Sequence, residues 1–129
     1  MLDLPVLTST ITDTHFTQRA RMGRMLTFMA RVITDGWASR VKGIGVDEDA
    51  AALVTSRGVA TVVGQGSVSF VKIRADDVVS CAPGAPPETR FLDVHVIHVG
   101  STFDIAAWSG DPNPPVRVRV KDGALHWIA

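Results

Sequence analysis

The chain has 129 residues, of which 46% are hydrophobic, so it is long enough to bury one core of ordinary size. Lysine plus arginine number 13, as do aspartate plus glutamate, and this balance gives no indication of a nucleic-acid or anionic-membrane partner. The single cysteine, Cys81, excludes an internal disulfide framework and a multi-cysteine metal site.

The sequence predicts neither a membrane span nor a signal peptide in its opening residues. No apolar run approaches the roughly 18 residues that a spanning helix needs. The opening residues, MLDLPVLTSTITD, lack the basic and long apolar regions of a signal peptide. We therefore expect a soluble chain without a membrane partner, cytoplasmic by default.

The first third is predicted to form an extended segment, a helix and a return strand. Residues 2–11 are apolar and β-branched, which favours an extended segment or short strand. A one-sided helix is predicted over about 17–33, capped by Asp13 or Thr14 and stopped by Asp35-Gly36. Its apolar residues recur at spacings of three and four: Met22, Met25, Leu26, Met29, Val32 and Ile33.

The rest of the chain is predicted to consist of strands, turns and two proline-rich loops. The loops are residues 81–90 and 109–116, and Asp122-Gly123 indicates a tight hairpin near the end. The predicted strands are 43–46, 51–55, 59–63, 67–73, 92–99 and 116–121.

A single clear helix before a run of strands differs from a doubly wound domain, which alternates strands and helices throughout. The pattern predicts the closing part of an α/β fold, with one main helix followed by several strands and a terminal hairpin. An α+β domain would give the same pattern.

His15 and Glu48 are predicted to lie at the same end of the fold. A helix over 17–33 is about 25 Å long, and the strand that starts at Gly43 runs back over about 15 Å. Its end would therefore return near the helix start, where sites form in open α/β sheets. A carboxylate there would orient the imidazole and leave its other nitrogen as a base. From spacing alone, the simpler interpretation is favoured, in which His15 only begins a helix and residues 47–49 form a solvated turn.

Arginine is concentrated after His15, at positions 19, 21 and 24. These positions do not form one helical stripe, and basic residues near a helix start gain nothing from its dipole. Either an anionic ligand or acidic partner side chains would account for them. A solvated face with salt bridges remains the alternative.

Other motifs are weaker, and they predict neither a metal nor a cofactor. His95 and His98 lie three apart on a predicted strand, so they point to opposite faces and make a poor metal pair. In GIGVDE a glutamate replaces the third glycine of a dinucleotide fingerprint, and the paired glycines would instead let a buried strand pack closely.

The segments DTHFTQRARMGRM, GIGVDEDAAALV and ATVVGQGSVSF resemble the C-terminal half of cyanophycinases, serine peptidases related to the aspartyl dipeptidases. The resemblance covers about residues 2–73 and continues more loosely through LDVHVIHVGSTFDI. It implies the C-terminal part of a three-layer fold like class I glutamine amidotransferases, which is flavodoxin-like. Residues 1–129 would be a single domain or a fragment of a larger peptidase domain. Within it, 1–73 would hold the histidine and core strands, and 74–129 the closing strands and hairpin.

The resemblance also implies roles for individual residues. His15 matches the catalytic base and Glu48 the acid that supports it. The implied substrate is an aspartate-rich or cyanophycin-like peptide, a poly-aspartate backbone with arginine on its side chains. Threonine stands at position 14, where cyanophycinases commonly have glutamine, and this departure affects substrate preference. The residues implied to line the substrate pocket are Asp13, Thr14, Arg19, Arg21 and Arg24.

The nucleophile implied by the resemblance is missing, because the chain has no Gly-x-Ser-x-Gly turn. Ser67 and Ser101 follow glycines but lack the second glycine and a following helix. We expect hydrolysis of cyanophycin or aspartyl peptides to require an N-terminal half that carries the serine. We also expect a homodimer, since a fragment would expose sheet edges. The alternative is an inactive remnant whose arginines bind an anionic peptide or protein.

Overall fold

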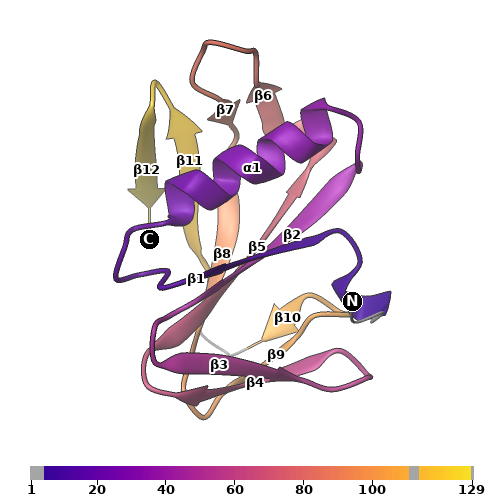
Figure 1. The fold of residues 1–129 in the computed structure, drawn as a ribbon, viewed down its shortest axis with the longest axis vertical. Coiled ribbons are helices and arrows are strands. Elements are labelled where there is room, and N and C mark those ends of the chain that lie inside the picture. The colour runs from indigo at the N-terminus through magenta and orange to yellow at the C-terminus, as the bar shows by residue number, and fades with distance from the viewer. Residues whose placement is uncertain (1–4, 111–113, 129) are drawn as a thin grey trace.

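A six-stranded sheet forms the middle layer of the computed structural model, which describes residues 5–110 and 114–128. Helix α1 (Met22–Thr34) lies across one face of this sheet (Figure 1). The strand order is β1 (Thr10–Thr14), β2 (Arg40–Val46), β5 (Ser67–Arg74), β8 (Leu92–His98), β11 (Val116–Lys121) and β12 (Ala124–Ile128).

A four-stranded sheet packs on the opposite face of the middle layer. It covers only the half of that face where β2 ends and β5 begins, as its contacts with Ile44, Val68 and Phe70 indicate. Its order is β10 (Ser109–Gly110), β9 (Thr102–Asp104), β4 (Val59–Gly64) and β3 (Ala50–Val54). The remaining elements are the pair β6 (Val78–Ser80) and β7 (Glu88–Thr89) and the 3-10 turns η1 (Pro5–Leu7) and η2 (Ala75–Asp77).

Parallel pairing occurs between β1 and β2, which α1 connects, whereas the other described strand pairs are antiparallel. A parallel pair needs such a crossover, because the chain must return to the same end of the sheet. The α/β fold class, with one helix followed by several strands and a terminal hairpin, is confirmed.

Two glycines in β2 make room for neighbouring side chains: Gly43 for those of α1, and Gly45 for Phe16 in the turn before the helix. A Cβ atom on Gly43 would lie 2.7 Å from the sulfur of Met29, and one on Gly45 would lie 2.4 Å from the Phe16 ring. A side chain at Gly45 would clash with the buried Phe16 ring, and one at Gly43 would force the methionine side chains of α1 to shift. The predicted role of the paired glycines, close packing of a buried strand, is confirmed.

The helix begins at Met22, later than the predicted start near residue 17, and the predicted cap is wrong. Its N-cap position is Arg21, without a capping side-chain hydrogen bond. The preceding residues form turns, in which the Arg21 amide donates to the Phe16 carbonyl. The predicted end is confirmed, since Asp35 is the C-cap and Gly36 has a φ of 79°.

Short strands were missed by the sequence prediction. β7 lies inside the predicted loop 81–90 and pairs with β6, and β10 lies in the predicted loop 109–116. Strands of two or three residues are too short to show a period, so their pairing depends on partners far along the chain. The predicted segment 2–11 becomes η1 followed by the start of β1. Its residues 2–4 and residues 111–113 of the loop lie outside the described residues. Within the described parts of the chain, no helix has the length and apolar character to cross a membrane.

Candidate active site

The chain turns sharply where β1 ends. His15 follows β1 directly and has a φ of 50°, a left-handed conformation that histidine adopts more readily than most residues. The turn lets the Phe16 amide donate to the Val46 carbonyl at the end of β2, at 3.1 Å. The Phe16 ring then packs on Gly45 and is 4% exposed. Packing of Phe16 therefore fixes the backbone conformation at His15.

His15 and Glu48 are brought together at the carboxyl ends of β1 and β2. The Nδ1 atom of His15 lies 3.5 Å from a carboxylate oxygen of Glu48, and both side chains are partly exposed, at 37% and 54%. The backbone amide of Glu48 donates to the side-chain oxygen of Gln18 at 3.1 Å, which fixes the backbone from which the acid projects. The contact engages one ring nitrogen of His15 and leaves Nε2 as the possible base. The predicted proximity of these two residues is confirmed, and their catalytic role stays a prediction.

Asp47 has a different environment from its neighbour Glu48. Its carboxylate is buried and accepts hydrogen bonds from the amides of Thr17 and Ser67, at 3.1 and 2.9 Å, and from the Ser67 hydroxyl at 3.2 Å. Burial raises the pKa of Asp47, but the hydrogen bonds from Thr17 and Ser67 outweigh it, and the pKa lies below its usual value. Asp47 therefore ties the turn after His15 to β5.

The sequence analysis predicts Glu48 as the acid beside His15, with a solvated turn at 47–49 as the alternative, and it assigns no separate role to Asp47. The sequence signal for Asp47 is its position as the first residue after a buried strand. In the structure Gly66 and Ser67 lie opposite it. Gln18 was also missed, because a glutamine in a turn carries no recognisable pattern.

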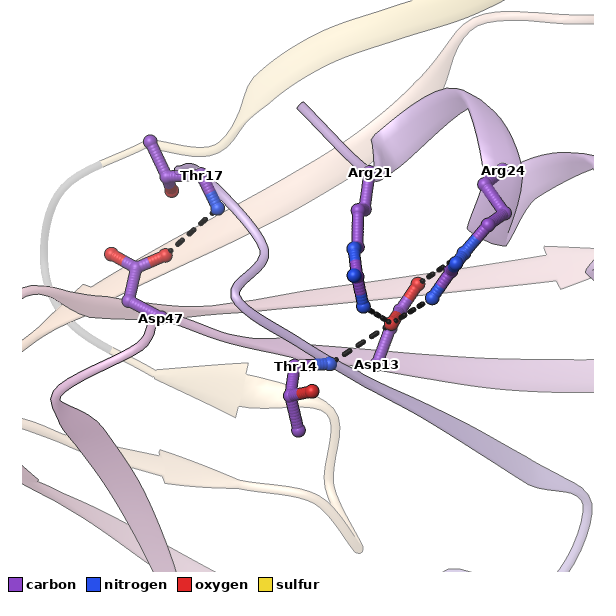
Figure 2. A network of polar contacts seen from close by, with 6 residues as sticks. All are labelled: Asp13, Thr14, Thr17, Arg21, Arg24 and Asp47. Carbon is purple, nitrogen blue, oxygen red and sulfur yellow. Dashed lines mark hydrogen bonds and ion pairs between the residues drawn. The ribbon is translucent and has the colours of Figure 1, made fainter. Parts of the chain in front are cut away.

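Asp13 lies at the centre of an arginine network (Figure 2). Arg24 donates to it from Nε at 3.1 Å and from Nη2 at 2.6 Å, and Arg21 donates from Nη1 at 3.1 Å. The Thr14 amide donates to the same carboxylate at 2.9 Å. Burial raises the pKa of Asp13, but the hydrogen bonds from Arg24 and Arg21 outweigh it, so the pKa lies below its usual value.

This network accounts for two of the three arginines that follow His15 in the sequence. Arg21 and Arg24 bind an acidic side chain of the chain itself, Asp13. Arg19 is exposed and forms no ion pair with any other residue of 5–110 or 114–128. Thr14 is exposed, and its amide supports Asp13.

The described serines supply no partner for His15. The hydroxyl of Ser67 is buried and bonds to Asp47, and in the part of the chain that the structure describes no serine hydroxyl bonds to the His15 ring. Over the same residues, no group of three or more histidine, cysteine, aspartate or glutamate side chains is placed to hold a metal ion. The arrangement offers a ring nitrogen of His15 that can accept and return a proton, and the described residues place no serine hydroxyl against it.

Comparison with known proteins gives one consistent relationship. No family model matches the chain. Curated cyanophycinases from Trichormus variabilis and from a Nostoc species are each 30% identical to it over 105 residues, which is 79% of this chain and 33% of the relative. The chain is cyanophycinase-like. It spans about a third of the length of the curated relatives that it matches.

Proposed function

We propose that this chain supplies the catalytic base and its supporting acid to a cyanophycinase-like serine peptidase. A further polypeptide segment supplies the nucleophilic serine, and the substrate is cyanophycin or another aspartyl peptide. The observation that carries the proposal is the contact of His15 Nδ1 with Glu48 at the carboxyl ends of two parallel strands. The similarity to cyanophycinases supports the reaction class.

Each residue has a defined role in the proposed reaction. Glu48 holds the His15 ring and stabilises its protonated form. Nε2 of His15 takes the proton from the serine hydroxyl as the oxygen attacks the peptide carbonyl. The same nitrogen then gives that proton to the leaving amine. Water then attacks the acyl intermediate and gives its proton to Nε2 of His15. The histidine returns this proton to the serine oxygen as the acyl group leaves, so both residues are restored.

The edge of β1 is the place where we expect the serine-bearing segment to join. β1 pairs with β2 on one side and with no other described strand. The Lys42 amide donates to the Ser9 carbonyl, so by alternation the backbone groups of Thr10, Thr12 and Thr14 face the open edge. A parallel strand added there would lie about 4.8 Å from β1 and end at the level of His15. A serine directly after such a strand would lie close to the imidazole.

The alternative, an inactive remnant that binds an anionic peptide through its arginines, receives less support from the contacts. Arg21 and Arg24 are held by Asp13, which neutralises part of their charge. Of the three arginines, Arg19 is the one that forms no ion pair with a described residue, and it is exposed. We therefore expect Arg21 and Arg24 to shape the pocket wall, with Arg19 at its rim contacting the substrate.

A fusion enzyme tests the proposal directly. This chain would be expressed alone and as one polypeptide with the part of the Nostoc cyanophycinase that it does not match, and both would be assayed on cyanophycin and aspartyl dipeptides. We expect turnover in the fusion only, and a fall of about 10²–10⁴-fold in kcat for His15→Asn, the range typical of a lost general base. Asparagine tolerates the left-handed backbone at this position, so folding is preserved.

Arg57→Gln, in an exposed turn, is the matched control and should retain full turnover. A folded fusion without turnover, or turnover that survives His15→Asn, would reject the proposed role of the histidine.

A further inference from the structure

Basic residues gather on one face of the six-stranded sheet, the face opposite α1. They lie on β2, β5 and β11 at the end that the four-stranded sheet leaves uncovered. Together they make up seven of the 13 lysines and arginines of a chain whose net charge is zero. These residues are Arg40, Lys42, Lys72, Arg74, Arg117, Arg119 and Lys121.

Strand register places like charges directly opposite each other. Arg40 pairs with Arg74, and Lys42 with Lys72, across the antiparallel β2–β5 ladder. Directly opposed like charges destabilise a sheet. Arg40, Lys72 and Arg74 form no ion pair with another described residue. Burial lowers the pKa of Lys72, and the neighbouring charges of Arg74, Arg40 and Lys42 lower it further. The stability of the fold therefore does not account for this arrangement.

The same side chains line a hollow in the surface. Lys72, Arg74 and Arg117 border a cavity of about 490 Å³, and Arg74 also borders a neighbouring cavity of about 330 Å³ that includes Arg40. Two aromatic rings hold the cations over the larger cavity. The ammonium of Lys72 lies 5.2 Å from the centre of the Trp108 ring, and the guanidinium of Arg117 lies 5.4 Å from that of Phe91.

Two acids, Asp77 and Asp93, also line the larger cavity. The carboxylate of Asp77 accepts the Arg74 amide at 2.8 Å, and Asp93 lies 3.6 Å from Arg117. Their negative charges would repel a long anionic polymer that crosses the edge of the cavity. They leave a local positive centre at Lys72 and Arg74, so the site favours a small ligand.

We propose that this hollow binds a compact polyanion with at least two negative charges, such as a diphosphate or a tricarboxylate. The ligand would neutralise Lys72 and Arg74, whose charges lie opposite those of Lys42 and Arg40. The planar guanidinium of Arg74 offers paired N–H donors to the ligand's oxygens. The site is separate from the candidate active site, because Arg40 and His15 lie at opposite ends of the β1–β2 pair. The length of β2 alone separates these ends by roughly 20 Å.

The test is binding and thermal unfolding of the whole chain with inorganic diphosphate, citrate and acetate at constant ionic strength. We expect diphosphate or citrate to raise the Tm and to bind at least tenfold more tightly than acetate. Lys72→Gln/Arg74→Gln should weaken binding at least tenfold and, without anion, raise the Tm, because the opposed like charges are gone. A residue with a purely structural role would lower the Tm when replaced.

Arg57→Gln is the control, since it removes one exposed positive charge in the β3–β4 turn and should change neither property. Stronger binding of diphosphate would identify a phosphate ligand, and stronger binding of citrate a carboxylate. An equal response of the wild-type chain and the double variant, or no response to either polyanion, would overturn the proposal.

Discussion

Replacement of Asp13 by asparagine is expected to destabilise the fold by about 2–3 kcal/mol at pH 7. Asp13 is 9% exposed and accepts three hydrogen bonds from two arginines. A hydrogen bond to a charged group contributes about 1.5–3 kcal/mol. Arg24 is half exposed, so water replaces much of its share, whereas Arg21 is 17% exposed and loses a partner that water replaces poorly. Asparagine has no negative charge to pair with the two guanidinium groups, and its amide nitrogen cannot accept the hydrogen bond that the second carboxylate oxygen accepts from Arg24.

The effect should depend on pH in one direction. The pKa of Asp13 is lowered in the folded chain from its usual 3.8, so its stabilising contribution is fully present above that value. It is lost as the pH falls through the folded-state pKa. The difference in urea unfolding between wild type and Asp13→Asn should therefore be largest at pH 7 and should shrink as the pH falls below 3.8.

Asp35→Asn is the matched control, because Asp35 forms an exposed i,i+4 ion pair with Arg31. Its cost should be about 0.5 kcal/mol or less. An equal cost for the two variants at pH 7, or a difference for Asp13→Asn that persists unchanged at pH 2, would refute the assigned role of the network.

Two further predictions concern packing and association. Gly45→Ala places a methyl group against the Phe16 ring and should lower stability by about 1–3 kcal/mol, the usual cost of overpacking, in urea unfolding; an unchanged midpoint would show that the ring moves freely. Trp127 is 49% exposed on the edge strand β12, and the homodimer remains a prediction. Trp127→Lys should shift sedimentation toward the monomer if β12 forms the contact, and an unaltered dimer would place the contact elsewhere.

Long periodic segments could be predicted from the sequence. The strands predicted at 59–63 and 67–73 each extend by one residue at the end, and the predicted hairpin at Asp122-Gly123 is confirmed. Alternation and turn residues are local properties, so a single chain reports them well. The start of α1 was missed because Asp13, the expected cap, is held by Arg21 and Arg24, a tertiary contact that local propensity does not record.

The candidate site could be predicted in part for a similar reason. The lengths of a helix and a strand fix where the chain returns, so the proximity of His15 and Glu48 followed from geometry. Whether an arginine binds a ligand or a residue of its own chain depends on side-chain positions, which spacing alone does not give. The like-charge pairs across β2 and β5 were also hidden, since they require the register of two strands.

The left-handed backbone of His15 has a consequence for how such a chain can evolve. Only a few residue types adopt this conformation readily, and glycine and asparagine are foremost among them. Either could replace the histidine while Phe16 keeps its place on Gly45. Mutation at this position can therefore end the proposed proton transfer with little penalty in folding. Selection for a folded product would not detect the loss, and inactive descendants could persist beside active ones with the same architecture.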